Sequence, residues 1–379
     1  MKTHMPRTLI VGGGIIGAAV AWACTQRGME VVVVEREHWG ASRATGQSGG
    51  IVRRFAREPW HRRLACRAFQ TFPRWAERVG GTCGWQRTGA LSLLGPELQK
   101  DDLLAIEEMR EMGTELEILQ VSELAHRRPD MCVEGVALAL YDPGGGYIDP
   151  RAATASLLSA ARHHGARTLE QWAYCTLRVG DGVRGIEEGN DFVDSDKVVL
   201  CNNAGAMELL ATIGITLPIE TRRILLQRVR SSVPPDRRIV CIDHAWDSYH
   251  RFTNQGEALI GCPSGPSGVD PQAPGMADED QLKYARDVAV RRLPCLEGAT
   301  LQEVRAGMDT YTPDRRPIVG PVPGVNGLYL ALAFNGCGVK VAPAIGALVC
   351  DHLTGESTES DDDLLPSRFF RQHNIPVKP

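Results

Sequence analysis

The sequence is poor in lysine, has no long apolar run and carries no surplus of either charge. Only six of its 379 residues are lysine, and 42 basic residues stand against 46 acidic ones, for a formal net charge of −4. A chain without a basic surplus gives no sign of binding nucleic acid or an anionic membrane surface. No apolar run approaches the ~20 residues that a membrane-spanning helix needs, so we expect no membrane span.

Cysteine spacing and the start of the chain argue against two further classes of protein. The 11 cysteines are odd in number, and no two of them are spaced Cys-x-x-Cys, which disfavours a disulfide framework or a zinc site. The first apolar run begins at residue 8, which leaves no room for a signal peptide before it. We therefore expect a cytoplasmic protein with reduced thiols. Its length and its 43% hydrophobic content suffice for a large core and two domains.

The stretch from residue 8 to residue 35 has the pattern of a dinucleotide-binding unit. The run TLIV predicts a buried parallel strand, and Gly12, Gly14 and Gly17 follow it as G-x-G-x-x-G. A small-residue helix comes next and then a second buried strand, MEVVVVE, which ends at Glu35. Strand, glycine turn, helix, strand and acid together are much more specific than the glycines alone. The alternative is a glycine-rich turn with a purely structural role.

Each part of this unit has a physical role in holding a dinucleotide. Gly12 makes the tight turn, Gly14 lets the backbone approach the pyrophosphate, and Gly17 lets the helix pack on the sheet. The helix N-terminus offers free N–H groups and the positive end of its dipole to the phosphates. Glu35 can accept hydrogen bonds from a ribose. The fingerprint by itself does not distinguish FAD from NAD.

Two later stretches favour FAD. After Glu35 comes a loop rich in glycine, serine and alanine, and small residues let the backbone lie close to a flat ligand. Ser42, Arg43 and Ser48 in this loop are suited to bonding phosphate or ribityl oxygens, although a plain surface loop is the alternative. Near the C-terminus a buried strand, GLYLALA, runs into the turn FNGCG and then into a helix. This turn aims backbone N–H groups at a ligand and can reach the flavin end of the cofactor.

These segments, taken in order, resemble the FAD-dependent amino-acid and amine oxidoreductases that include D-amino-acid oxidase, glycine oxidase and monomeric sarcosine oxidase. The resemblance runs through nearly the whole chain, in VGGGIIG, GQSGGIVRRF, GGYIDPRAATASLLSAARHHGA, VVLCNNAGAM, TPDRRPIVG, FNGCGVKVAPAIG and LLPSRF. It implies an α/β fold with a Rossmann-type, glutathione-reductase-like FAD-binding domain formed by residues 1–84, 141–217 and 305–379. Residues 85–140 and 218–304 would form an interleaved α+β substrate domain, built on an antiparallel sheet that roofs the flavin.

The resemblance also implies which residues bind the FAD. They are Gly12, Gly14, Ile15, Ile16, Gly17, Glu35, Arg36, Ser42, Arg43, Gln47, Ser48, Gly49, Gly50, Ala204, Gly205, Asn335, Gly336, Cys337, Gly338, Val339 and Lys340. In the family the turn after VVLC touches the cofactor and is usually richer in alanine. Asn202 and Asn203 depart from that pattern.

The family's reaction implies a substrate with a carboxylate, and a buried carboxylate needs a cationic side chain beside it. In that reaction a hydride leaves the carbon next to an amine for the flavin N5, and the resulting imine hydrolyses. The resemblance points to Arg53 and Lys340 as the residues that hold the carboxylate of an amino acid or N-alkyl amino acid. The alternatives are a salt bridge or phosphate contact for Arg53 and a solvent-exposed helix start for Lys340. Arg54 could also take the place of Arg53.

The segment SYHRF is expected to form a strand of the roof over the flavin. Tyr249, His250 and Arg251 lie in it, and alternation puts Tyr249 and Arg251 on one face and His250 on the other. All three are candidate substrate contacts, since the pattern does not say which face looks at the substrate. A core tyrosine and a neutral core histidine are the simpler interpretation of these two residues taken alone.

Two departures from the sarcosine oxidases bear on the cofactor and on the electron acceptor. The cysteine that bonds the flavin in those enzymes aligns here with Gly307, so we expect noncovalent FAD. Cys337, close to the flavin turn, is the one cysteine that could contradict this. The segment FTNQGEALI is predicted to form a hairpin of the roof, with Gly256 in its turn. In the sarcosine oxidases a lysine after this hairpin activates oxygen, whereas here the first lysine after it is Lys283. This weakens the case for O2 as acceptor and leaves room for a dehydrogenase that passes electrons to a quinone or a protein.

Two other functions stay open. A flavin monooxygenase also begins with G-x-G-x-x-G, but it would need a second, NAD(P)H-linked step, and the chain has no second fingerprint. A flavoprotein electron-relay subunit of a larger amine dehydrogenase complex would use the fold to bind FAD and partners. The presence of both Arg53 and Lys340 favours an enzyme that itself binds a small-molecule amino acid or amine.

Overall fold

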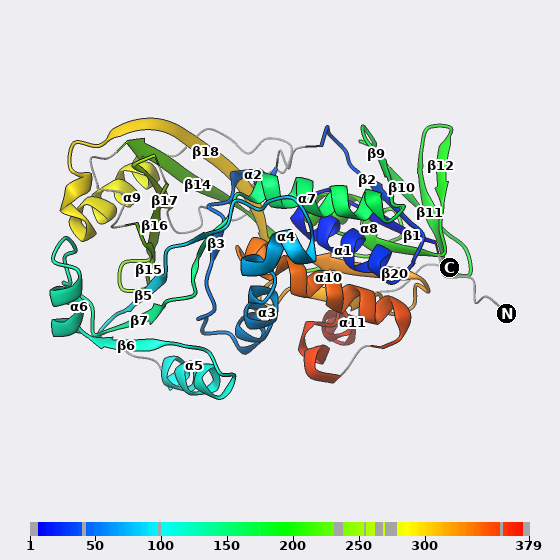
Figure 1. Ribbon diagram of the computed structural model, residues 1–379. Coiled ribbons are helices and arrows are strands. Elements are labelled where there is room, and N and C mark those ends of the chain that lie inside the picture. The colour runs from blue at the N-terminus through cyan, green and yellow to red at the C-terminus, as the bar shows by residue number, and fades with distance from the viewer. Residues whose placement is uncertain are drawn as a thin grey trace.

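The computed structural model describes residues 7–39, 43–97, 100–173, 175–230, 238–253, 255–261, 268–269, 279–356 and 359–373. Two large sheets lie at opposite ends of an elongated molecule, and the long strands β14 (Glu220–Arg230) and β18 (Thr300–Tyr311) lead from one end toward the other (Figure 1).

The first sheet has six strands, and most of its neighbouring strands are parallel. Its order is β19 (Ile318–Pro321), β20 (Leu328–Leu332), β13 (Lys197–Leu200), β1 (Thr8–Val11), β2 (Val31–Val34) and β9 (Arg167–Leu169). Only the β19–β20 pair is antiparallel. Every residue of β1 and β2 is buried, which explains why these strands read as unbroken apolar runs rather than as alternating patterns.

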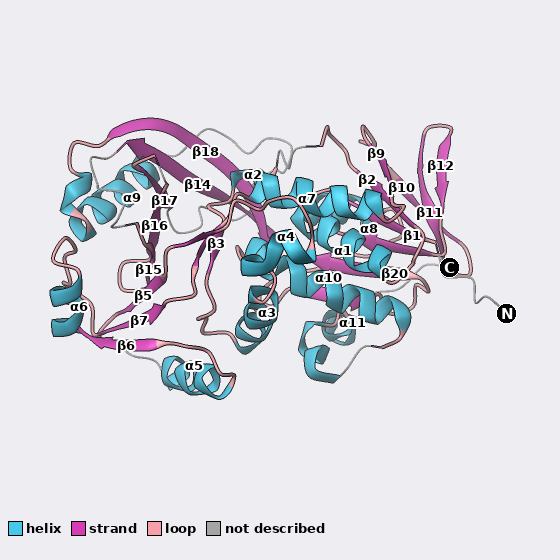
Figure 2. Cartoon of the chain, viewed as in Figure 1, coloured by secondary structure: helices cyan, strands magenta, loops and turns pink. Residues whose placement is uncertain are grey.

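Three helices cover one face of this sheet: α1 (Ile15–Gln26), α7 (Pro150–His163) and α10 (Gly338–Thr354) (Figure 2). Small residues let α1 and α10 approach closely, since a Cβ at Gly346 would overlap the Ala19 carbonyl. Asp149 caps α7 by accepting hydrogen bonds from the backbone N–H groups of the first turn, and this fixes the start of the helix. Beside these helices lie α3 (Pro59–Phe69), the 3-10 turn η1 (Phe72–Arg74) and α4 (Trp75–Arg78).

The other face of the six-stranded sheet packs against a small antiparallel sheet and two short helices. The small sheet consists of β10 (Thr176–Val179), β11 (Val183–Glu188) and β12 (Asp191–Asp194). The helices are α8 (Ala206–Ala211) and α11 (Ser367–His373). The 3-10 segment η5 (Glu359–Leu364) precedes α11.

The second large sheet has eight strands. Its order is β18, β14, β17 (Glu257–Gly261), β16 (Ser248–Phe252), β15 (Val240–Asp243), β5 (Ala90–Leu94), β7 (Leu138–Asp142) and β6 (Glu117–Gln120). One face packs against α9 (Glu279–Arg292), η4 (Pro294–Leu296) and α6 (Val121–Arg127). The helix α5 (Lys100–Glu111) packs against β6 and β7 at the end of the sheet.

Short elements join the two large sheets. The strands β3 (Ile51–Val52), β8 (Gly146–Tyr147) and β4 (Gln86–Arg87) form a small antiparallel sheet between them. The helix α2 (Ala44–Gln47) and the 3-10 turn η2 (Asn203–Gly205) lie where the loops of the first sheet meet β18.

The predicted fold class is confirmed, with one difference in the second sheet. The expected roof was antiparallel, but β15 and β5 pair in parallel. Parallel neighbours need a long crossover, and the chain between these strands runs through β6 to β14, two of which belong to the six-stranded sheet. The eight strands come from residues 90–142 and 220–311, so β18 crosses the expected domain boundary at residue 305. The division into two domains therefore stays a prediction. Among the described residues, no helix combines the length and the apolar character that a membrane span requires.

Candidate functional site

Three connected cavities, of 440, 340 and 100 Å³, lie along the junction of the two large sheets. The 440 Å³ cavity runs from the glycine turn after β1 past the end of β2 to η2. The 340 Å³ cavity lies between the turn before α10 and the inner face of the eight-stranded sheet. The 100 Å³ cavity lies between the turns that begin α1 and α10, and Ala44 lines all three. The volume is therefore one elongated site that suits an extended dinucleotide.

The glycine turn leaves space and free backbone donors at one end of this site. Gly12 has φ +106°, which L side chains rarely adopt, and a Cβ there would lie 2.9 Å from the Asn202 backbone. A Cβ at Gly17 would overlap the Gly12 carbonyl oxygen. Gly14 is the N-cap of α1 and has no side chain to cap it, while the Ile15 N–H donates to Thr45 Oγ1 over 3.2 Å. The other N–H groups of the first turn and the helix dipole face the cavity.

Glu35 lies at the end of β2 and lines the 440 Å³ cavity. Its Oε2 accepts a hydrogen bond of 2.7 Å from the Gly13 backbone N–H, and its Oε1 accepts one of 3.1 Å from the Glu37 N–H. These bonds hold the carboxylate beside the glycine turn, where a ribose bound with its phosphates on α1 would lie. Arg36 forms an ion pair of 3.0 Å with Glu208, and Arg43 pairs with Glu37. Ser42 lies outside the described residues.

The turn at η2 ties three cavity-lining segments together. Asn203, at φ +51°, donates from Nδ2 to Asp309 Oδ1 over 3.1 Å, and its Oδ1 accepts from the Ala333 N–H over 3.3 Å. Asp309 also accepts a hydrogen bond of 2.8 Å from the Gly336 N–H. Burial raises the pKa of the Asp309 carboxyl. Asn203, one of the two departures from the family pattern, is thus part of a buried polar network that includes Asp309. No pattern in the sequence had indicated Asp309.

Asn202 gives a direct indication of a bound ligand. Its Oδ1 is buried and has no hydrogen-bond partner among the described residues, and the side chain lines the 440 Å³ cavity. Buried polar atoms in native proteins are normally paired. A ligand donor in the cavity would satisfy this atom, so the site fits a dinucleotide both in shape and in hydrogen bonding.

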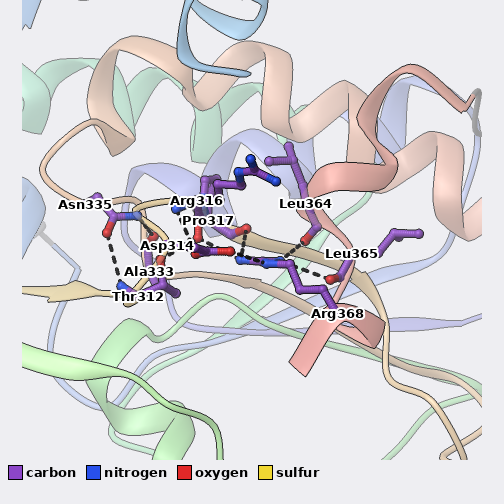
Figure 3. A network of polar contacts seen from close by, with 9 residues as sticks. All are labelled: Thr312, Asp314, Arg316, Pro317, Ala333, Asn335, Leu364, Leu365 and Arg368. Atoms are coloured by element: carbon purple, nitrogen blue, oxygen red, sulfur yellow. Dashed lines mark hydrogen bonds and ion pairs between the residues drawn. The ribbon is translucent and has the colours of Figure 1, made fainter. Parts of the chain in front are cut away.

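The turn before α10 is held in place from behind. Asn335, at φ +53°, accepts a hydrogen bond of 3.1 Å from the Thr312 N–H and donates one of 2.6 Å to the Ala333 carbonyl. Figure 3 shows this turn beside a second group of contacts centred on Arg368 of α11. The Arg368 guanidinium donates to Asp314 over 2.8 Å and to the Arg316 carbonyl over 2.9 Å. The C-terminal helix therefore braces the 312–317 loop that supports the turn.

Two cations line the 340 Å³ cavity without a salt bridge to any described acidic residue. Arg53 follows β3, and its Nε and Nη1 are buried with no hydrogen-bond partner. Lys340 lies in the first turn of α10 with 8% of its surface exposed. Burial lowers the pKa of both side chains. Two buried cations facing one cavity are the arrangement that a bound anion would stabilise.

Arg54 has a different environment from Arg53. Its guanidinium pairs with Asp142, with Nε 3.1 Å from Oδ2, and lies 4.4 Å from the centre of the Phe69 ring. The side chain is not among those that line the cavities. The two neighbouring arginines are therefore not interchangeable.

The three candidates from the roofing strand β16 are separated by the structure. Tyr249 lines the 340 Å³ cavity, where its ring lies over Gly261. Arg251, on the same face, lines none of the three cavities: its Nε donates to the Gly49 carbonyl over 2.5 Å and its guanidinium lies over the Tyr147 ring. His250 lies on the opposite face, on the side of Phe252, and burial lowers its pKa to about 3. Because strand side chains alternate, His250 cannot reach the cavity.

The remaining candidates lie along the elongated site. The 340 Å³ cavity is lined by Gln47, Ser48, Gly49, Gly50, Asn335, Gly336, Cys337 and Val339, and the other two by Ile15, Ile16, Gly338, Ala204 and Gly205. Gly307, on β18, lines both larger cavities, and a Cβ there would lie 2.9 Å from the Gln47 Cβ. The sequence analysis missed His244, which also lines the 340 Å³ cavity; burial, with Arg53 nearby, lowers its pKa to about 3.

Metal ligands are not grouped in the described part of the chain. No cluster of three or more histidine, cysteine, aspartate or glutamate side chains there could hold a metal ion.

Comparison with known proteins agrees with this geometry. The family model described as DAO, FAD dependent oxidoreductase, matches residues 7–352. The chain is 26% identical to 4-methylaminobutanoate oxidase (formaldehyde-forming) of Paenarthrobacter nicotinovorans, over 98% of this chain and 46% of that protein. It is 26% identical to glycine oxidase of Geobacillus kaustophilus, over 97% and 98% of the two chains. The chain thus spans about half the length of the first relative and nearly all of the second.

A solved structure supports the fold. The crystal structure of L-proline dehydrogenase from P. horikoshii superposes with a TM-score of 0.86, covering 97% of this chain and 99% of that chain at 23% identity.

Proposed function

The chain belongs to the DAO family of FAD-dependent oxidoreductases, and on that premise we propose that it oxidises the C–N bond of a small amino acid or N-alkyl amino acid. FAD, when bound, accepts the hydride that leaves the carbon next to the amine nitrogen. The residues of the chain bind the cofactor, hold the substrate carboxylate and keep water out of the cavity.

The cofactor would lie along the three connected cavities. The first turn of α1 suits the pyrophosphate, and Glu35 suits a ribose. The turn before α10 suits the flavin, because it adjoins the 340 Å³ cavity and is held rigidly by Asn335 and Asp309. We propose that the FAD is noncovalent, since Gly307 on β18 offers no thiol where the covalent sarcosine oxidases have one.

The observation that carries the substrate class is the pair of buried cations, Arg53 and Lys340. A carboxylate entering the 340 Å³ cavity would accept hydrogen bonds from the Arg53 guanidinium, whose Nε and Nη1 have no partner among the described residues. Charge-assisted hydrogen bonds of this kind are the strong ones, and the planar guanidinium matches a carboxylate with two parallel bonds. A substrate without a carboxylate would leave the buried Arg53 nitrogens without a partner.

The roof supplies the rest of the substrate site. Tyr249, Ile242 and Ile224 form the inner face of the eight-stranded sheet over this cavity. A substrate bound beside these largely apolar side chains would displace water from the cavity, and this would strengthen the electrostatic attraction between the cations and the substrate. A substrate held between the cations and the roof would be oriented with the carbon next to its amine within reach of the cofactor.

An oxygen-free titration tests this proposal. The visible spectrum of the purified yellow protein is recorded before and after the addition of pools of amino acids, of N-methyl amino acids and of simple amines. We expect a pool with carboxylates to bleach the flavin band and the matching amines to leave it unchanged. Bleaching by the amines with equal efficiency would refute the role of the cations, and no bleaching by any pool would refute the substrate class. Readmission of air then distinguishes O2 from a quinone or protein acceptor.

A further inference from the structure

A cysteine and a histidine from distant parts of the chain meet in the wall of the 340 Å³ cavity. Cys337 is the N-cap of α10, lines that cavity and is partly exposed. Its Sγ lies 3.5 Å from Nδ1 of His61, which belongs to α3 and is 2% exposed. A thiol in contact with an imidazole can transfer its proton to that imidazole and become a thiolate.

The surroundings of the sulfur favour its charged form. The charged and titratable groups that face it are His61, Glu58, Lys340, Arg53 and Tyr311. Glu58 Oε2 lies 3.9 Å from His61 Nδ1, and its interaction with His61 lowers the pKa of Glu58 to about 2. Burial alone raises the pKa of the Cys337 thiol, but His61, Lys340 and Arg53 together outweigh it and lower the pKa to about 7. These neighbours therefore give Cys337 more thiolate character than an ordinary cysteine has.

The other described cysteines lack either the lowered thiol pKa of Cys337 or its position on the wall of a cavity. Burial raises the pKa of Cys66, Cys83, Cys175, Cys201 and Cys241. A hydrogen bond to Cys24 lowers the pKa of Cys350, but both thiols are fully buried and line none of the three cavities. Cys337 alone among these combines thiolate character with a position on a cavity wall.

We infer that Cys337 is a modification site at which a small hydroperoxide oxidises the thiol to a sulfenic acid, and that this oxidation blocks the carboxylate-binding end of the cavity. Susceptibility of a cysteine to peroxide follows its thiolate character and its accessibility. The first part of the inference rests on the cysteine, the histidine and the cavity. The second part rests on the proposed function of Arg53 and Lys340.

The oxidation step balances with hydrogen peroxide as the oxidant. The Cys337 sulfur attacks one peroxide oxygen, an S–O bond forms and the O–O bond breaks. The sulfur loses two electrons, and the departing oxygen leaves as water after it takes a proton from the His61 imidazolium. Two equivalents of an added thiol reverse the step, giving back the Cys337 thiol, one water and the added thiol's disulfide.

Oxidation changes what the two cations face. The new oxygen on Cys337 lies on the cavity wall beside Lys340, which already interacts with the unmodified sulfur. It occupies volume at that end and offers an acceptor to the same cations that would bind the substrate carboxylate. We therefore expect weaker carboxylate binding after oxidation, with the cofactor retained.

The first test locates the reactive thiol. The FAD-bound protein is treated with hydrogen peroxide in the presence of dimedone, which traps sulfenic acids, and the labelled cysteines are identified by mass spectrometry. We expect Cys337 to be labelled at least tenfold faster than Cys66 or Cys201. In His61→Gln the labelling of Cys337 should slow about tenfold, because the thiol loses its imidazole partner and returns toward an ordinary pKa. Labelling of Cys337 no faster than that of Cys66 would overturn the modification site.

The second test measures the consequence. Acetate serves as the carboxylate probe, and its dissociation constant is determined from the change that it causes in the flavin spectrum. Peroxide should weaken acetate binding at least tenfold, dithiothreitol should restore it, and Cys337→Ser should be insensitive to peroxide. Labelling of Cys337 with unchanged acetate binding would overturn the blocking effect. If the untreated protein bound no acetate, the proposed function would fail, while labelling of Cys337 would still uphold the modification site.

Discussion

Replacing Arg53 with methionine tests the carboxylate site most directly. Methionine keeps most of the length of the side chain and removes the guanidinium. Arg53 Nε and Nη1 are buried without partners among the described residues, so one edge of the guanidinium is available for two charge-assisted hydrogen bonds to a carboxylate, each worth about 1.5–3 kcal/mol. Two such bonds at the lower end of this range give about 3 kcal/mol, and each 1.4 kcal/mol corresponds to a factor of ten in affinity. We therefore expect the dissociation constant of a carboxylate ligand to rise about a hundredfold.

The assay compares Arg53→Met with a matched change at the next residue. Acetate and the substrate found by the oxygen-free titration are bound to the FAD-loaded protein, and dissociation constants are read from the flavin spectrum. Arg54→Lys is the control, because Arg54 pairs with Asp142 and lines none of the cavities. It should lower the unfolding temperature, since it disturbs a buried ion pair, and leave acetate affinity within about twofold.

Two outcomes would refute this reasoning. If Arg53→Met bound acetate as tightly as the unmodified protein, the unpaired nitrogens would not belong to a carboxylate site. If Arg54→Lys lost as much affinity as Arg53→Met, the effect would come from disturbed packing around β3 rather than from the guanidinium that faces the cavity.

Three further changes test the cofactor turn, the buried histidine and the C-terminal brace. Gly17→Ala should lower the FAD content of the purified protein, measured by absorbance, because its Cβ would overlap the Gly12 carbonyl oxygen. Gly180→Ala, which meets no atom within 4 Å and does not have a left-handed φ, should retain FAD. The native pKa of His250 is about 3, below the ordinary 6.5, so between these pH values only the unfolded chain takes up this proton and the unfolding free energy falls as pH falls. His250→Phe should reduce this pH dependence by up to about 1.4 kcal/mol per pH unit. Urea unfolding at several pH values measures the slope, and an unchanged slope would contradict the lowered pKa. Arg368→Lys should lower the unfolding free energy by about 1–3 kcal/mol in thermal or urea unfolding, because an ammonium cannot reproduce a planar fork bonded to Asp314 and to backbone carbonyls; unchanged stability would show that the brace is dispensable.

The cofactor end of the site was predictable because its parts lie close together in the chain. The glycine turn, the small-residue helix and Glu35 occupy fewer than thirty residues, and each has a distinctive pattern. The structure places them as a strand, a turn and a helix with Glu35 hydrogen-bonded to Gly13. Local sequence is sufficient where neighbouring residues build the feature.

The substrate end was less predictable because its residues meet only after distant segments pair. Asp309 binds Asn203 across 106 positions, and Cys337 contacts His61 across 276. No periodicity along the chain signals such contacts. In β16, alternation separated His250 from Tyr249, but only the packing of the eight-stranded sheet on α9 decides that the histidine faces away from the cavity.

Arg251 illustrates how a residue near the site can serve it without lining it. Its Nε donates to the Gly49 carbonyl, and its guanidinium lies 4.0 Å from the centre of the Tyr147 ring. Gly49 belongs to the glycine-rich loop that lines the 340 Å³ cavity, and Tyr147 belongs to the small sheet between the two large ones. The bond therefore joins the roofing strand β16 to the loop that runs on to Arg53. We interpret Arg251 as a residue that positions this loop relative to the roof, and with the loop the arginine that we propose binds the carboxylate.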